Sequence, residues 1–283
     1  MGGVAVRVRK KMACTTTNAR TQNRGRDGEA LQSEGRLDEA VDAYRRAFAL
    51  RPGDPIGQRN LAVALVTQGK LDEAIEHLRE ALRLRPDLIE AESDLALALG
   101  TKGQLEEAID RYRSVLRRQP HSAEVESNLA VVESNLGNRL LGAGEVDRAL
   151  DLLRDAVRLA PQSADQHYNL GMTLGIHGRP AEAIQELSRA LEIDPKHASA
   201  HYELANVYRA QRRLEPAAAE YREAIRLSPN FVDAYNNLGI TLGSLGRNDE
   251  AAEQFRLALK MNSQYEAARA NLQLLDSSRS PGR

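Results

Sequence analysis

The stretch that decides the fold is GKLDEAIEHLREALRLRP, residues 69–86. Gly69 suits a point where a helix ends and the chain reverses, and the acidic pair Asp72 and Glu73 suits the first turn of the next helix. Pro86 then ends that helix. The same framing recurs along the chain, with prolines at one constant interval that is broken by a single longer gap, before Pro161: Pro52, Pro86, Pro120, Pro161, Pro195 and Pro229. The stretch therefore predicts one helix-turn-helix unit, repeated in tandem.

Small and large residues recur at fixed positions of each unit, numbered so that its proline stands at position 32. Position 8 is always Gly or Ala, and large apolar residues, all of them Leu, Tyr or Phe, fill positions 11 and 24 in every unit. Small residues at fixed sites predict that the two helices of a unit touch closely there. Position 20 is alanine in all seven units: Ala40, Ala74, Ala108, Ala149, Ala183, Ala217 and Ala251.

This pattern resembles the tetratricopeptide repeat (TPR) family over residues 21–263. The resemblance implies an all-α, right-handed α-solenoid of tandem helix-turn-helix units with a C-terminal capping helix. We expect a solenoid over 21–276 with units at 21–54, 55–88, 89–122, 123–163, 164–197, 198–231 and 232–265, a cap at 266–276, a disordered basic arm at 1–20 and a disordered tail at 277–283. Two departures are visible: position 4, often aromatic in the family, has only Tyr235, and the first unit has Asp27 at position 7. The first helix, Thr21 to Glu34, has little apolar face and is expected to be frayed or irregular.

The fourth unit is longer than the others because a heptad is nearly duplicated. Residues 126–132, ESNLAVV, precede Glu133-Ser-Asn-Leu-Gly137. A heptad comes to within roughly 20° of two full turns, so the helix can lengthen to about 122–141 without turning its apolar face away. The lengthened helix can then dock on the third unit in either of two registers. One register uses Leu129 and Ala130, and the other uses Leu136 and Gly137. We expect a local discontinuity there, with a neutral duplication as the alternative.

In the family, the first helices form a concave binding wall, and position 6 of each unit faces it. Asparagine fills five of the seven sites at that position when the second to seventh units and the cap are counted, and its amide can bond the main chain of an extended peptide. The column is similar to the substrate-binding superhelix of O-linked N-acetylglucosamine transferases, most closely at Pro229–Gly239. The alternative is that these side chains only bond neighbouring helices. The candidate binding residues are Asn60, Asp94, Asn135, Asn169, Tyr168, Tyr202, Glu203, Asn206, Asn236, Asn237 and Asn271.

No motif for catalysis, metal or cofactor binding is found in the sequence. Cys14 is the single cysteine, which excludes a thiolate cage and an internal disulfide. His197 and His201 could share one helix face, but no cysteine is near them and the His-Glu spacing of a zinc hydrolase is missing, so packing or surface roles are favoured. No glycine-rich phosphate loop follows a strand. We therefore expect no enzyme activity, no cofactor and no metal.

Charge is unevenly distributed along the 283 residues. Residues 1–26 hold seven basic and no acidic residues, whereas residues 27–276 carry a net charge of −10. No apolar run is long enough to span a bilayer or to serve as a secretory signal, so a cytoplasmic location is expected. The leading hypothesis is a scaffold that binds a neutral or basic peptide or protein. The alternatives are a targeting or regulatory subunit of a separate glycosyltransferase or other enzyme, and a weaker one, nucleic-acid contact through the basic arm.

Overall fold

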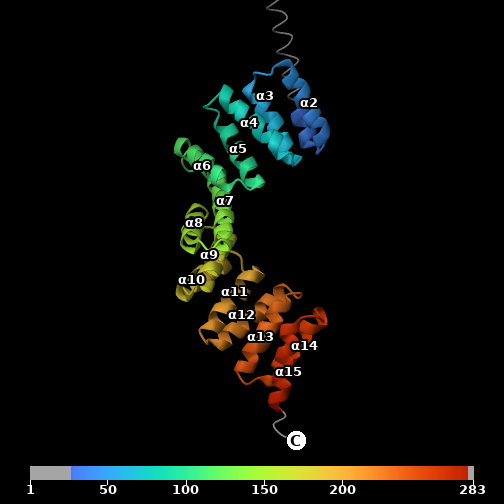
Figure 1. Ribbon diagram of the computed structural model, residues 1–283, viewed down its shortest axis with the longest axis vertical. Coiled ribbons are helices and arrows are strands. Elements are labelled where there is room, and N and C mark those ends of the chain that lie inside the picture. Colours follow the sequence, from blue (N-terminus) through green and yellow to red (C-terminus); the bar gives the residue numbers. More distant parts are fainter. Residues whose placement is uncertain (1–26, 280–283) are drawn as a thin grey trace, which may run out of the picture. The chain divides into compact units, whose positions relative to one another are not determined.

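The computed structural model describes residues 27–279, with side chains to residue 277. Helices and no strands occur in that range, so the all-α prediction is confirmed for it (Figure 1). The predicted basic arm at 1–20 lies outside the described residues. A helical segment at 27–33 is followed by α2 (Leu37–Leu50), α3 (Pro55–Thr67), α4 (Leu71–Leu84), α5 (Ile89–Lys102), α6 (Leu105–Arg118), α7 (Ala123–Gly142), α8 (Val146–Leu159), α9 (Ala164–Ile176), α10 (Pro180–Ile193), α11 (Ala198–Ala210), α12 (Leu214–Leu227), α13 (Val232–Ser244), α14 (Asn248–Met261) and α15 (Glu266–Arg279).

The turn inside each unit has a left-handed residue at position 15. The six glycines predicted there have φ angles between 74° and 86°: Gly35, Gly69, Gly103, Gly144, Gly178 and Gly246. The sixth unit has Arg212 at this position, and its φ is 61°. The turn geometry is therefore kept even where the residue is not glycine.

The two helices of a unit touch at the predicted small residues. All seven position-20 alanines are fully buried. A Cβ added to Gly171 would lie 2.7 Å from Cγ of Leu187 and 3.0 Å from its backbone nitrogen, so position 8 packs directly against position 24. A Cβ added to Gly28 would likewise lie 2.6 Å from Cε1 of the Tyr44 ring. This contact explains why residues 27–33 are helical, contrary to the expected irregularity of that segment, whose residues 21–26 lie outside the described range.

The chain divides into two compact units, residues 1–136 and 137–283, and the division falls inside α7. In the first unit, α3 packs against α4 and α5 against α6, and the first helices α3 and α5 also touch. In the second unit, the pairs α9–α10, α11–α12 and α13–α14 stack in order. Its first helices α9, α11, α13 and α15 touch one another in sequence, which sets their side chains in a row.

Helix α7 is a 20-residue helix, close to the expected 122–141, and its two heptads have different neighbours. A Cβ on Gly100 of α5 would lie 3.1 Å from Val132, just as a Cβ on Gly175 of α9 would lie 2.9 Å from Val207 of α11. The first heptad therefore docks on the third repeat, with Leu129 buried beside it. A Cβ on Gly137 would lie 3.2 Å from Leu153 of α8, so the second heptad completes its own hairpin.

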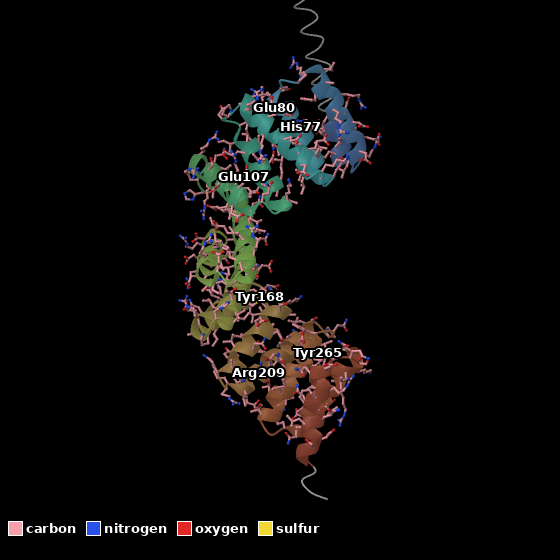
Figure 2. The ribbon with its side chains drawn as sticks, in the orientation of Figure 1. His77, Glu80, Glu107, Tyr168, Arg209 and Tyr265 are labelled. Carbon is pink, nitrogen blue, oxygen red and sulfur yellow. The ribbon has the colours of Figure 1, made fainter. Side chains whose placement is uncertain are left out.

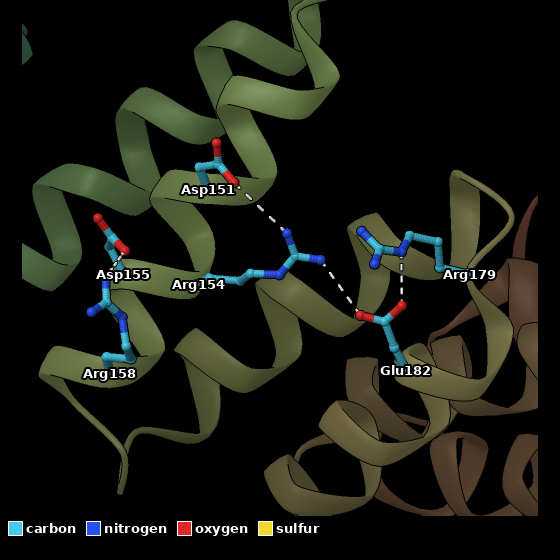
Figure 3. A network of polar contacts seen from close by, with 6 residues as sticks. All are labelled: Asp151, Arg154, Asp155, Arg158, Arg179 and Glu182. Carbon is cyan, nitrogen blue, oxygen red and sulfur yellow. Dashed lines mark hydrogen bonds and ion pairs between the residues drawn. The ribbon is translucent and has the colours of Figure 1, made fainter.

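Ion pairs link the second helices of adjoining repeats. In each pair an arginine at position 25 meets a glutamate at position 19 of the next repeat. Figure 3 shows one case, Arg154 between Asp151 of its own helix and Glu182 of α10. The four pairs are Arg45–Glu73 at 2.7 Å, Arg79–Glu107 at 3.0 Å, Arg154–Glu182 at 3.5 Å and Arg222–Glu250 at 3.8 Å.

The closing helix α15 packs as a cap but is longer than predicted. Leu272 and Leu275 pack against the core of the last repeat, as expected, while Gln273 and Asp276 are exposed. The helix ends at Arg279 rather than 276, so the prediction of a disordered tail from 277 is wrong for residues 277–279. The physical reason is that no helix-breaking residue occurs before Pro281. Residues 280–283 lie outside the described range.

Candidate functional site

All eleven candidate residues lie on first helices of the repeats, and we call the surface that these helices present within each compact unit its first-helix face. They are Asn60 on α3, Asp94 on α5, Asn135 on α7, Tyr168 and Asn169 on α9, Tyr202, Glu203 and Asn206 on α11, Asn236 and Asn237 on α13, and Asn271 on α15. Asn135 is exposed, Asn236 is buried, and the other nine are half-buried. Figure 2 labels Tyr168 on α9 and Arg209 on α11. In the second compact unit, candidates on the first helices α11, α13 and α15 contact one another.

A chain of asparagine side chains runs across α15, α13 and α11. Asn271 Nδ2 donates to Asn236 Oδ1 at 2.9 Å, and Asn236 Nδ2 donates to Asn237 Oδ1 at 3.3 Å. Asn237 Nδ2 then donates to Asn206 Oδ1 at 3.1 Å and to the hydroxyl of Tyr202 at 3.0 Å. These amides hold neighbouring first helices together, which was the alternative role weighed for them.

The chain of amides ends on a buried tyrosine. The Tyr221 hydroxyl donates to Asn206 Oδ1 at 2.5 Å and accepts from Nε of Arg209 at 3.2 Å. Burial raises the pKa of Tyr221 to about 12, so the phenol stays protonated and keeps its role as a donor. The Tyr202 ring lies 4.5 Å from that of Phe231, and burial also raises the Tyr202 pKa. This part of the face is a fixed polar lattice with aromatic support.

Other asparagines of the column have free amides. Within the described residues, the side chains of Asn60, Asn135 and Asn169 make no hydrogen bond to the rest of the chain. A free amide offers two donors and two acceptor lone pairs, which can pair with a peptide backbone. The column is therefore split between amides that build the scaffold and amides that remain available.

The two acidic members of the column have different partners. Asp94 Oδ2 accepts from Nε of Arg59 on α3 at 2.5 Å, whereas Glu203 accepts from Asn206 at 3.1 Å. Burial raises the pKa of both carboxyls, and it outweighs the lowering by these hydrogen bonds. The Arg59–Asp94 pair joins position 5 of one repeat to position 6 of the next, as Tyr202 and Asn237 do. Sequence reasoning missed this link, although the equal separation of the two pairs along the chain could have revealed it.

Counting through the duplicated heptad affects which asparagine belongs to the column. Asn135 is at position 6 when counted back from Pro161. Asn128, however, follows Asp94 by the same interval that separates Pro52 from Pro86, which we call one repeat length, and it is half-buried. Since the first heptad docks on the third repeat, Asn128 continues the column of the first compact unit. It was not among the predicted candidates.

Polar residues at position 4 join the first helix of a repeat to its second helix and to the proline before the repeat. These bonds account for the polar residues found where the family often has an aromatic one. His167 Nδ1 lies 2.6 Å from Glu186 of α10, and its Nε2 lies 3.2 Å from the carbonyl oxygen of Pro161. His201 makes the same contacts with Glu220 and Pro195, at the same distances. Gln58 replaces histidine in the second repeat and contacts His77 and Pro52.

The pair His197 and His201 does not form a metal site. His197 caps α11 by accepting from the backbone nitrogen of Ala200, and its ring stacks 4.8 Å from that of Tyr168, while His201 contacts Glu220. No cluster of three or more metal-ligating side chains occurs among residues 27–277. No helix within the described part of the chain is long and apolar enough to cross a membrane.

A hollow of about 660 Å³ lies between α8, α9 and α10, on the side of the second helices. Its floor leucines, Leu170 and Leu174, are only 3% and 1% exposed, so these two side chains offer a ligand almost no surface. The charged groups at its rim pair with one another, as Arg154 and Glu182 do in Figure 3. The first-helix face is therefore the stronger candidate.

The fold and the first-helix face together define a class of protein. It is a helical-repeat scaffold in which each repeat packs against its neighbours in the chain. Models of the tetratricopeptide repeat match residues 27–89, 134–198 and 232–273, and a TPR model matches residues 205–246. Together they cover more than half of the sequence, and the chain belongs to the tetratricopeptide repeat family. Repeats of this family serve in general as protein-interaction modules.

Solved structures include several similar proteins. A crystal structure of MamA is 27% identical, with a TM-score of 0.52, and the match covers 62% of this chain and 92% of that one. YrrB, described as a TPR protein with an unusual peptide-binding site, is 25% identical, with a TM-score of 0.52 and coverage of 69% and 96%. The C-terminal part of a TPR protein from Cytophaga hutchinsonii has a TM-score of 0.71 at 16% identity, covering 88% and 99%, and shows the fold alone. The comparison with curated proteins gave no match.

Proposed function

We propose that the protein is a non-catalytic scaffold that binds an extended segment of a partner protein along its first-helix face. The free amides of Asn60 and Asn135 in the first compact unit, and of Asn169 in the second, bond main-chain groups of the partner, and the tyrosines of the second unit supply contact area. The fixed amides around Asn237 keep successive first helices in register. The observation that carries the proposal is this division of one asparagine column into held and available side chains.

The family and one relative support a peptide as the ligand. Tetratricopeptide repeats bind protein or peptide partners, and YrrB has a peptide-binding site by its description. The surplus of acidic residues over residues 27–276 favours a neutral or basic segment, because an acidic one would be repelled. Main-chain recognition by amides selects for extended shape more than for particular side chains.

The experiment is capture of partners from cell extract with the full chain as bait. The variant Asn60→Ala/Asn169→Ala removes two available amides, while Asn230→Ala removes an exposed asparagine from a turn and serves as the control. We expect the double variant to lose the partners that the wild type and the control retain, with no change in thermal unfolding. Retention of every partner by a folded double variant would refute the role of the asparagine column.

A second variant separates binding from folding. Asn237→Ala removes three hydrogen bonds within the chain, so we expect lower stability together with weaker capture. If Asn169→Ala weakens capture at unchanged stability whereas Asn237→Ala lowers both, the division of the column stands.

A further inference from the structure

Two large apolar side chains are exposed at the same repeat position in the first compact unit. Leu97 on α5 is 44% exposed and Val131 on α7 is 48% exposed, and they are one repeat length apart. The helices are neighbours, because a Cβ on Gly100 would lie 3.1 Å from Val132. Val63 on α3, one further repeat length towards the N-terminus, is half-buried. Leu97 and Val131 therefore form an apolar row on helix faces that no described residue covers.

An acidic row accompanies the apolar one on the same two helices. Glu90 and Asp94 lie seven and three residues before Leu97, and Glu124 lies seven residues before Val131, so each helix presents these side chains on one stripe. Glu90 and Glu124 both lie close enough to contribute to the raised pKa of Asp94, after burial as the main cause. Among the described residues, Arg59 is the one cation paired with this group, which leaves a surplus of negative charge.

An occupant of this surface must offer apolar and basic side chains in alternation. Residues 4–12 of this chain read Val-Ala-Val-Arg-Val-Arg-Lys-Lys-Met, with four basic and no acidic residues. In an extended segment, successive side chains point to opposite sides, so Val4, Val6 and Val8 share one side and Arg7 and Arg9 share the other. The pattern of this segment complements both rows.

The length of chain before residue 27 is sufficient for the segment to reach them. Met12 is fifteen residues before Asp27 and can lie up to roughly 50 Å from it. Helices pack at roughly 8–10 Å, so α5, two repeats further on in the same compact unit, lies well within that range.

We propose that residues 4–12 bind in cis to the rows formed by Leu97, Val131, Glu90 and Glu124. The valines cover the apolar row and the arginines meet the carboxylates. The segment then occupies the first-helix face of residues 27–136 until an external partner displaces it. The inference stands apart from the proposed function, because it needs no external partner and its site is formed by Leu97, Val131, Glu90 and Glu124 rather than by the available amides of Asn60, Asn135 and Asn169.

Paramagnetic relaxation in the full chain tests the inference, with a nitroxide attached to Cys14, the single cysteine. We expect the amide signals around residues 94–98 and 128–132 to broaden. Arg7→Glu/Arg9→Glu and Leu97→Ser/Val131→Ser should each abolish most of this broadening, as should 1 M salt, where the screening length falls to about 3 Å. Ile176→Ser, at an apolar residue of α9 that is 70% exposed, is the matched control and should leave the broadening unchanged.

Three results would overturn the inference. The first is the absence of broadening on α5 and α7, and the second is broadening that survives both double variants. The third is equal broadening of an isotope-labelled Cys14→Ser chain by spin-labelled molecules, because the contact would then form between molecules. Each of these results leaves the capture experiment with Asn60 and Asn169 unaffected, so the two proposals fail separately.

Discussion

Arg212 carries a backbone conformation that glycine adopts at the six equivalent turns. Its φ of 61° lies in the left-handed region, and this backbone conformation costs about 1–2 kcal/mol for a residue that has a Cβ. We expect Arg212→Gly to stabilise the second compact unit by about 0.5–1 kcal/mol, since part of the gain is offset by the greater freedom of glycine in the unfolded chain. Urea unfolding measures the change. Arg212→Ala keeps the Cβ and should show no gain; an equal gain in both variants would exclude relief of backbone strain as the cause.

Gly171 is required by close packing rather than by backbone conformation. A Cβ there would meet a backbone atom of Leu187 at 3.0 Å, which cannot move aside as a flexible side chain can. We expect Gly171→Ala to cost about 1–2 kcal/mol, net of the better helix propensity of alanine. Gly57→Ala is the control: its Cβ would find only Asp54, at 3.5 Å or more, and should stabilise by up to about 1 kcal/mol. Chemical denaturation that ranks the two variants in the opposite order would contradict the packing argument.

His201 links stability to pH because both of its ring nitrogens face acceptors. Only the imidazolium can donate to both Glu220 and the Pro195 carbonyl, and the hydrogen bond with Glu220 raises the pKa of His201 above its ordinary 6.5. The stabilisation is therefore complete below the unfolded pKa of about 6.5 and is lost as pH rises through the raised value. We expect the difference in thermal midpoint between wild type and His201→Gln to shrink as pH rises. A titration by NMR that gives His201 a pKa at or below its ordinary value would reject this account.

At the scale of the element, helix α7 shows that a duplicated heptad need not be redundant. The two copies of the heptad differ at their last residue. Val132 of the first copy lies against Gly100 of α5, whereas the second copy has Arg139 at the corresponding position. Deletion of 126–132 would bring Arg139 into the apolar site of Val132. Deletion of 133–139 would instead place Ala130 against Leu153, as Ala62 is placed relative to Leu78 in the second repeat.

The two deletions shorten the helix equally but should not be equally stable. We expect the chain lacking 126–132 to be the less stable by about 2 kcal/mol, a typical cost for a buried charged side chain without a suitable partner. Circular dichroism checks that both variants lose a similar amount of helix, and thermal unfolding compares their stabilities. Equal stability of both variants would show that the heptads are interchangeable and their duplication incidental.

Features set by contacts inside a repeat could be predicted from the sequence. The glycine turns, the buried alanines and the contact of position 8 with position 24 all depend on residues that face each other at one fixed spacing. The contacts between repeats could not, because they depend on which side chains on neighbouring helices come within bonding distance. The Arg59–Asp94 pair, and the division between held Asn237 and available Asn169, are of this second kind. Position 4 is an exception inside the repeat: His167 and Gln58 bond their own second helices in the same way with different chemistry, so no single residue type marks the contact.

At the scale of the whole molecule, stability in each compact unit is a sum over neighbouring repeats. The ion pairs of the second helices illustrate this, because each joins only one repeat to the next. An exposed pair contributes about 0.2–1 kcal/mol. Arg45 links the first repeat to the second and Arg79 links the second to the third, and the two pairs share no residue. Their contributions should therefore add, as expected for a chain of nearest-neighbour contacts.

The double variant Arg45→Gln/Arg79→Gln tests that additivity. We expect its loss in unfolding free energy to equal the sum of the two single losses within about 0.5 kcal/mol, and both losses to fall at 1 M salt, which screens exposed charges. Arg46→Gln on the same helix is the control, since no ion pair joins Arg46 to another described residue, and it should be neutral. Urea unfolding at low and at high salt gives the loss in unfolding free energy for the two single variants, the double variant and the control. A double loss well above the sum would mean that the three repeats act as one cooperative electrostatic network, and nearest-neighbour contacts alone would not describe the unit.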